Sequence, residues 1–313
     1  MTGIENSSQE LDYWTERLCR SIASRYQAGD TSWKSIKGLN LSYVLENTFD
    51  INCFYTLSAA LILQGEKSVR IGSTDYYYGA GTMVVTSVDV PAQFSLTASK
   101  EKPFISMSLK LDPFLLAELM PLAQRDAVSV SPAAGEGDAQ SFLVTKSTPS
   151  ILEAFDQLLR LADNPVAAEA LMPGTLRRIH YLVLTHNAAI NLRQYSDHRL
   201  PSSRIAKAVA WIRSHYSETI RIEKLASLCA MAPSTFHQHF RSITSITPLQ
   251  YQKRIRLNEA RRLMISEGNS ASEAAFAVGY ESVQQFTREY KRLFGAPPAR
   301  DAKRSVESAK RAG

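Results

Sequence analysis

The chain has 313 residues, 44% of them hydrophobic and 21% charged, which is typical of a soluble globular protein long enough for two domains. No apolar run approaches the ~20 residues that span a bilayer, and the N-terminus, MTGIENSSQELDYW, is acidic and polar where a secretory signal is basic and then apolar. The sequence therefore predicts a cytoplasmic protein with no membrane partner. Three scattered cysteines, Cys19, Cys53 and Cys229, argue against a disulfide framework and a thiolate zinc site.

Charge is divided unevenly along the chain. Residues 200–313 hold 19 Lys and Arg against 9 Asp and Glu, a net charge of +10, and residues 1–199 hold 17 against 21, a net charge of −4. A basic third attached to a mildly acidic two-thirds indicates that one domain meets a polyanion and the other does not. A merely solvated basic face would give the same counts, so charge alone leaves both readings open.

Short β-branched and aromatic runs dominate residues 52–111. In order they are CFYTLSAALIL, KSVRIG, GTMVVTSVDV, FSLTAS and FISMSLKL, and turns rich in Gly and Pro separate them. This pattern predicts an antiparallel barrel or sandwich in the first domain.

Helical spacing replaces the strand pattern after Asp112. A short helix is predicted over 114–122, a loop over 129–140, and amphipathic helices over 151–161 and 176–192. Both amphipathic helices can cover the sheet, and the second fits a dimer seam equally well. The polar stretch RQYSDHRLPSS, residues 193–203, is predicted to be the interdomain linker.

Beyond this linker, Pro and Gly residues separate six predicted helices. They span 203–216, 222–229, 233–243, 248–266, 271–278 and 282–294, and a seventh can follow Pro297. The segment 301–313 is predicted to be a basic, disordered tail because it has too little apolar content for a core.

The helix predicted over 233–243, PSTFHQHFRSI, has one apolar face. Phe236, Phe240 and Ile243 recur at helical spacing and should be buried. The side chains then left outward, or at the edge in the case of the first histidine, are Ser234, His237, Gln238 and Arg241. Because IEKLASLC before it carries its own apolar stripe, the pair predicts a helix-turn-helix.

The helix predicted over 282–294 repeats this arrangement. Phe286, Tyr290 and Leu293 should face inward, and the outward side chains include Gln284, Gln285, Arg288 and Lys291. Gly279 is placed to end the preceding helix in a left-handed conformation, and Ser282 can cap the next one. The sequence thus predicts two helix-turn-helix units.

A continuous helical pattern, PLQYQKRIRLNEARRLMIS, separates the two units. Its 19 residues span ~28 Å, and successive major grooves on one face of DNA lie ~34–36 Å apart. One chain can therefore set two recognition helices into adjacent grooves, where Gln reads adenine, Arg reads guanine, and Lys, Arg and Ser bind phosphate. An arginine such as Arg241 or Arg288, taken alone, is more often an ordinary surface charge, but the duplicated arrangement with its spacer favours DNA binding.

Residues 204–300 closely resemble the C-terminal DNA-binding domain of the AraC/XylS family of bacterial transcriptional regulators. The segments that carry the resemblance are IEKLASLCAMAPSTFHQHFRSITSITPLQYQKRIRLNEARRLM and AFAVGYESVQQFTREYKRLFGAPP. The resemblance implies a regulator, by family habit an activator, that binds double-stranded DNA and contacts RNA polymerase. The residues it implies for DNA reading are Ser234, His237, Gln238, Arg241, Gln284, Gln285, Arg288 and Lys291. Ser245 stands where the family usually has Gly, so the first recognition helix must tolerate a left-handed Ser or use another cap.

Residues 10–195 resemble, less specifically, the N-terminal domain of one subgroup of this family. The resemblance implies a cupin-like antiparallel β-barrel with flanking helices that serve sensing and dimerisation, and hence a homodimer. None of the six histidines lies in the strand region, so a metal-dependent oxygenase site is not expected. The whole chain is then an α+β protein with domains at 10–195 and 204–300 and no metal or other cofactor.

Aromatic residues of the strand region offer a wall for a small organic effector. The candidate effector-binding residues are Phe54, Tyr55, Tyr76, Tyr78, Phe94 and Phe104. The alternative is that these rings simply fill the barrel and dimerisation alone controls the protein. Cys53 is likewise either a packing residue or a sensor thiol.

No nucleophile elbow, Walker loop or dinucleotide fingerprint occurs in the sequence, so we expect no enzyme. A DNA-targeted enzyme of the alkyltransferase kind would need clustered cysteines, and this chain has three scattered ones. A scaffold with vestigial DNA affinity remains a further alternative, and it predicts that substituting Gln238 and Arg288 leaves DNA binding unchanged.

Overall fold

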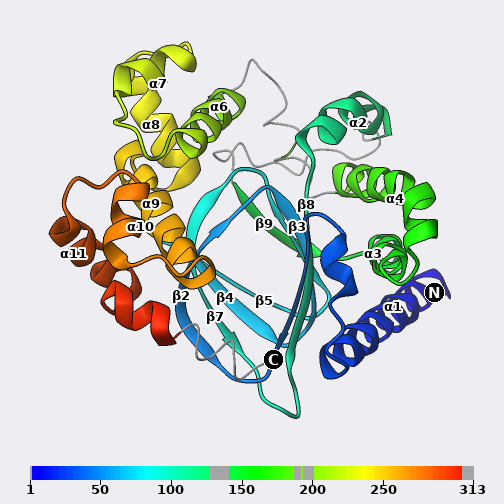
Figure 1. The fold of residues 1–313 in the computed structure, drawn as a ribbon. Coiled ribbons are helices and arrows are strands. Elements are labelled where there is room, and N and C mark those ends of the chain that lie inside the picture. Colours follow the sequence, from blue (N-terminus) through cyan, green and yellow to red (C-terminus); the bar gives the residue numbers. More distant parts are fainter. Residues whose placement is uncertain (1, 127–140, 187–191, 193–200, 305–313) are drawn as a thin grey trace.

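A computed structural model describes residues 2–126, 141–186, 192 and 201–304 of the protein, and side chains from residue 8 onward (Figure 1). Two sheets form the centre of the molecule. The helices α1, α3 and α4 lie on one side of them, and the helices α6 to α11 lie on the opposite side, next to β2.

All strand pairings in the described part of the chain are antiparallel, as predicted. The strands are β1 (Leu39–Val44), β2 (Thr48–Tyr55), β3 (Ser58–Gln64), β4 (Glu66–Ile71), β5 (Thr74–Gly79), β6 (Thr82–Thr86), β7 (Val90–Thr97), β8 (Phe104–Lys110) and β9 (Phe142–Lys146). They form a five-stranded sheet in the order β1-β8-β3-β6-β9 and a four-stranded sheet in the order β2-β7-β4-β5. The predicted barrel is therefore built as two sheets and not as one closed ring.

The run CFYTLSAALIL, predicted as one strand, is divided between the two sheets. β2 ends at Tyr55 and β3 begins at Ser58. At this corner the backbone N–H of Leu57 donates to Oδ1 of Asp89 at 3.0 Å, and the Ser58 hydroxyl donates to the carbonyl of Thr56 at 2.8 Å. Side-chain hydrogen bonds thus replace the strand ladder where the chain changes sheet.

Helices cover the outer face of the five-stranded sheet. They are α1 (Thr2–Gln27), the short 3-10 helix η1 (Ser32–Ser35), α2 (Pro113–Asp126), α3 (Pro149–Leu161) and α4 (Pro165–Thr185). Leu18 and Ile22 of α1, an element that the sequence analysis did not predict, are 0% exposed and join the core with Phe155 of α3. Ile179 and Val183 of α4 are buried in the same core, so these two side chains cover the sheet. The predicted loop at 129–140 lies outside the described residues.

The second domain is helical throughout its described length. Its helices are α6 (Pro201–Ser214), α7 (Ile222–Leu228), α8 (Pro233–Thr244), α9 (Pro248–Ser266), α10 (Ala271–Ala277) and α11 (Val283–Phe294). Residues 201–203, assigned above to the linker, already belong to α6, and 193–200 lie outside the described residues. Residues 298–304 are also helical, so the segment expected to be a tail from 301 keeps its helix to 304, and 305–313 lie outside the described residues.

Candidate nucleic-acid interface

The first helix-turn-helix unit consists of α7 and α8. Phe236 and Phe240 are 0% exposed and anchor α8, while three polar side chains of the predicted reading face are exposed. These are Ser234, Gln238 and Arg241, and His237 is half-buried beside them. α8 ends at Thr244, and the φ of 65° at the next residue, Ser245, shows that a non-Gly residue makes the left-handed turn.

The second unit consists of α10 and α11, and its recognition helix is capped at both ends. The Ser282 hydroxyl accepts from the backbone N–H of Gln285 at 3.3 Å, and Gly295 ends α11 with a φ of 76°. Phe286 and Tyr290 are 0% exposed. The four predicted reading residues are all exposed, and they are Gln284, Gln285, Arg288 and Lys291.

Arg256, in the middle of α9, links the two units. Its guanidinium donates to the carbonyls of Tyr216 at 2.6 Å, Ser217 at 3.1 Å and Glu218 at 2.9 Å in the loop before α7, and to that of Gly279 at 2.8 Å in the turn before α11. Gly279 has a φ of 86°, as predicted, and a Cβ there would collide with the Ser217 carbonyl. These contacts hold the loop of one unit against the turn of the other.

The side chain of Gln252 supports the same loop by donating to the carbonyls of Tyr216 at 2.8 Å and Glu218 at 2.5 Å. Sequence reasoning missed both residues because it treated α9 only as a spacer. The available signal was their spacing, since residues four apart lie on one helix face.

The helical domain docks on the outer face of the four-stranded sheet. Tyr251 of α9 is the centre of this contact: its ring meets Phe54 edge to face at 5.6 Å, and its hydroxyl donates to the carbonyl of Asp89 at 2.8 Å. The Asp89 carboxylate also forms an ion pair with Arg213 of α6. The amide of Asn52 in β2 donates to the carbonyl of Leu293 in α11 at 2.6 Å. Phe54 therefore faces the second domain.

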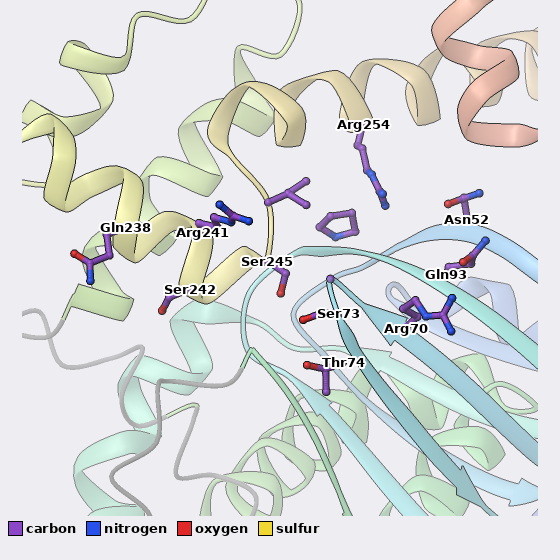
Figure 2. Close-up of a pocket in the computed structure, with 13 residues that line it drawn as sticks. Asn52, Arg70, Ser73, Thr74, Gln93, Gln238, Arg241, Ser242, Ser245 and Arg254 are labelled. Carbon is purple, nitrogen blue, oxygen red and sulfur yellow. The ribbon is translucent and has the colours of Figure 1, made fainter.

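A cleft of about 940 Å³ lies between α8, α9 and this sheet. Figure 2 shows Arg241 and Arg254 on the helical side and Arg70 on the sheet side. Gln238, Ser242 and Ser245 of the first unit also line the cleft. The turn between β4 and β5 touches the end of α8, because a Cβ on Gly72 would collide with the Ser245 side chain.

The cleft carries uncompensated positive charge. Arg70 pairs with Asp75 at 2.7 Å, but among the described residues Arg241 and Arg254 have no acidic partner. Burial lowers the pKa of Arg254 below its ordinary value, a sign that its charge is partly desolvated. Two guanidinium groups without counter-ions can accept an anion here.

The remaining effector candidates pack inside the two-sheet barrel. The rings of Tyr55, Tyr76 and Tyr78 surround Phe142 of β9, with centroids 5.2, 4.9 and 6.2 Å from its own. Phe142 is 1% exposed and fills the space between them.

Lys67 lies among the other aromatic candidates and was not predicted. Its Nζ is 4.2 Å from the ring centroid of Phe94 and 5.8 Å from that of Phe104. Burial lowers the pKa of Lys67 to about 8, and burial raises the pKa of the nearby Cys53 thiol to about 11. A thiol with a raised pKa is a poor nucleophile, which favours the packing role of Cys53.

Within the described residues we find no helix long and apolar enough to cross a membrane, and no group of three or more His, Cys, Asp or Glu side chains that could hold a metal ion.

Comparison with protein families matches residues 35–190 to the AraC-type transcriptional regulator N-terminus and residues 225–304 to a helix-turn-helix domain. The chain belongs to the AraC family of transcriptional regulators. Both predicted halves of this AraC-family protein are thus confirmed at the level of family.

Curated relatives of this AraC-family chain are transcriptional regulators by name. It is 30% identical over 147 residues to the transcriptional activator RhaS of Escherichia fergusonii, covering 47% of this chain and 52% of that protein. It is 29% identical over 130 residues to the uncharacterized regulator YobQ of Bacillus subtilis, covering 42% and 49%. The chain spans about half the length of the curated relatives it matches.

Among solved structures, the chain is similar in fold to ToxT of Vibrio cholerae. ToxT bound to (E)-4-(8-methylnaphthalen-1-yl)but-3-enoic acid superposes with a TM-score of 0.59 at 13% identity, covering 84% of this chain and 97% of that one. ToxT bound to an unsaturated fatty acid gives a TM-score of 0.56 at 12% identity, covering 84% and 94%. At 12–13% identity, this similarity shows only that the AraC-family protein shares the two-domain fold.

Proposed function

We propose that this protein regulates transcription by binding double-stranded DNA sequence-specifically with both recognition helices, α8 and α11. The observation that carries the proposal is the repeated exposed polar face on two units that Arg256 braces together. The net charge of +10 over residues 200–313 supplies the attraction for DNA phosphate. RhaS activators among the relatives support activation, with RNA polymerase as the partner that an activator contacts.

The proposed base-reading residues are the longer side chains of each face. Gln238 and Arg241 in α8 match Gln284 and Arg288 in α11, since an amide suits adenine and a guanidinium suits guanine. The proposed flanking contacts are Ser234, His237, Gln285 and Lys291, which can reach phosphate or a neighbouring base edge.

The test uses a duplex selected from random sequence by the full-length protein. Arg288→Ala should weaken binding to that duplex by roughly 1–3 kcal/mol and relax base preference at one position. Arg262→Ala, on the exposed side of α9, is the matched control and should bind like the wild type. Equal loss on all duplexes with a shallower salt dependence would reassign Arg288 to phosphate, and absence of any selected sequence would refute sequence-specific binding.

The proposed control of DNA binding is a small organic effector that carries an anionic group and occupies the cleft between the domains. Arg241 and Arg254 line this cleft without acidic partners, and Arg241 is also a proposed DNA reader. An anion bound there would compete with DNA for Arg241. Both ligands named for ToxT are acids, which supports the choice of a carboxylate.

Oleate is a suitable probe, with oleyl alcohol as its uncharged control. Oleate should raise the melting temperature of the wild type and weaken its DNA binding, whereas Arg254→Met should remove both effects. If Lys67→Met removes them and Arg254→Met does not, the effector lies in the barrel beside Tyr55, Tyr76, Tyr78, Phe94 and Phe104. If neither oleate nor oleyl alcohol changes the wild type, a carboxylate effector of this kind is excluded.

The proposed dimer surface is the exposed apolar part of α4 and α2. Val166 and Leu171 of α4 are 81% and 53% exposed, and Phe114 of α2 is 85% exposed. The predicted seam at 176–192 fits less well where the structure describes it, because Ile179 and Val183 are buried. Val166→Glu with Leu171→Glu should shift the protein toward the monomer in sedimentation velocity.

A further inference from the structure

A second hollow, of about 670 Å³, lies at the C-terminal end of α11. Its lining consists of Lys291, Gly295, Ala296, Pro297, Arg300, Lys303 and Arg304. Four of these seven residues carry a positive charge and none carries a negative one. The reading face of α11 accounts for Lys291 but not for Arg300, Lys303 and Arg304.

The hollow owes its shape to the turn after α11. Gly295 adopts a left-handed conformation with a φ of 76° and ends the helix, and Pro297 and Pro298 then start the helical segment 298–304. The turn brings this segment beside the last turn of α11, where Lys291 lies. A left-handed residue at this point favours Gly, because a Cβ would be strained.

A buried acid fixes the segment in place. Asp301 is 1% exposed, and its Oδ2 accepts from the hydroxyl of Tyr290 at 2.9 Å and from Nε of Arg261 at 2.7 Å. Because Asp301 points into the core, its neighbours Arg300 and Lys303 are exposed on the hollow side. Arg304 is held partly by Asp301 at 3.2 Å, so Arg300 and Lys303 are the cations best placed to bind a ligand.

The hollow continues the reading face of α11. Gln284, Arg288 and Lys291 follow one another at steps of four and three residues and therefore lie on one side of the helix. Lys291 is also part of the hollow. A duplex whose major groove receives this face would present the phosphates that border the groove to Arg300 and Lys303.

We propose that this hollow binds the DNA backbone at the edge of the groove that α11 reads, with Arg300 and Lys303 as the phosphate-binding residues. The inference rests on the proposed DNA-binding function and extends it to a second contact surface. The Arg fork matches two phosphate oxygens, and Lys supplies a compact charge. Such contacts set the position of the protein on the duplex without reading sequence.

The test is the salt dependence of binding to the selected duplex, measured with the full-length double variant Arg300→Ala, Lys303→Ala. Two lost phosphate contacts should make the slope of log K against log salt shallower by about 1 to 2, since each contact contributes about 0.9. Preference for the selected over a scrambled duplex should stay the same. The charge-conserving variant Arg300→Lys, Lys303→Arg should keep the slope of the wild type.

Two controls make the result decisive. Lys100→Ala with Lys102→Ala removes two charges from the exposed loop between β7 and β8 and should change neither slope nor affinity. Phosphate ethylation interference should give a signal next to the base pairs affected by Arg288→Ala, and the Arg300→Ala, Lys303→Ala variant should lose that signal alone.

A wild-type slope and an unchanged ethylation pattern in the double variant would overturn this inference while leaving the proposed function intact. A wild-type protein that binds no duplex would instead overturn the proposed function, and this inference with it. A double variant that melts at a lower temperature than the charge-conserving one, and binds all duplexes less without a change of slope, would point to a folding defect and also contradict the proposal.

Discussion

The two helix-turn-helix units share a plan but differ in what stabilises their ends. In the second unit Ser270 and Glu273 form a reciprocal capping box before α10, and Ser282 caps α11. In the first unit α7 and α8 begin after Arg221 and Ala232, neither of which makes a side-chain capping bond. The second unit is therefore specified by local signals, and the first depends on contacts elsewhere.

The hydrophobic contacts of the first unit extend through the helical domain into the N-terminal domain. Phe236 and Phe240 belong to a hydrophobic cluster that runs through Tyr251 into the four-stranded sheet. Phe286 and Tyr290 belong to a separate cluster confined to the helical domain. A change in the sheet should therefore reach the first recognition helix through packed hydrophobic side chains, and the second through the hydrogen bond from Asn52 to Leu293.

The largest expected effect concerns the brace that keeps the units together. Arg256→Ala removes four hydrogen bonds, and although Gln252 still donates to the carbonyls of Tyr216 and Glu218, those of Ser217 and Gly279 lose this donor. We expect the substitution to lower the free energy of unfolding by about 2–4 kcal/mol. Arg262→Ala, in the same helix but in exposed ion pairs with Glu259 and Glu267, should cost less than about 1 kcal/mol. Urea denaturation of both variants measures the difference, and equal costs would contradict the bracing role.

Two buried tyrosines allow a matched comparison of the units. Tyr290→Phe removes a hydrogen bond to the charged Asp301 and should cost about 1.5–3 kcal/mol, while Tyr251→Phe removes one to the neutral carbonyl of Asp89 and should cost about 1 kcal/mol. Only Tyr251→Phe should alter the coupling between oleate and DNA binding. Chemical denaturation and DNA titration with and without oleate separate these effects, and a change in coupling from Tyr290→Phe would erase the distinction between the units.

The residues that follow the two recognition helices, Ser245 and Gly295, can each be replaced by the residue found at the other position. Ser245→Gly relieves a left-handed non-Gly residue and should stabilise the protein by up to about 1 kcal/mol, while Gly295→Ser should destabilise it by about 1–2 kcal/mol. Thermal unfolding checks both signs. Because Ser245 also touches the β4–β5 turn, a loss of stability in Ser245→Gly would mean that this contact outweighs the backbone strain.

The smallest effect is a pH dependence confined to the second unit. Burial raises the pKa of Glu289, but hydrogen bonds from Lys253, Tyr280 and Gln285 outweigh it and leave the pKa below its ordinary value. A lowered pKa contributes stability above the unfolded value of about 4.3, and that contribution is lost as the pH falls through the folded value. Unfolding of Glu289→Gln between pH 7 and pH 3 should show a shallower decline than the wild type, and parallel curves would remove Glu289 as a source.

Most of the helical domain could be predicted from the sequence because its signals are local. Pro and Gly mark the ends of the helices, and the spacing of apolar residues marks their buried faces. The predicted helix over 248–266 matches α9 residue for residue, and the inward and outward sides of α8 and α11 are confirmed. The DNA-reading roles of those outward residues stay a prediction. The brace by Arg256 and the charged cleft around Arg254 depend on residues far apart in the chain, and a reading of local periodicity could not reveal them.

The N-terminal domain was predicted less completely because its sheets also depend on contacts between residues far apart in the chain. β1 and β9 lie outside the segment rich in strand signals, and they join the sheet through pairing with β8 and β6. Phe54 was predicted as a barrel wall, and it meets Tyr251 across the domain boundary. Strand alternation gives the two sides of a strand but does not tell which partner covers each side.

Asp89 connects three parts of the molecule through one residue. Its carboxylate holds the corner between β2 and β3 and pairs with α6, and its backbone carbonyl anchors α9. A displacement of this corner should affect the helical domain, because α6 and α9 are both bound to Asp89. We expect a shift of the two sheets against each other to change the tilt of the helical domain through these contacts of Asp89.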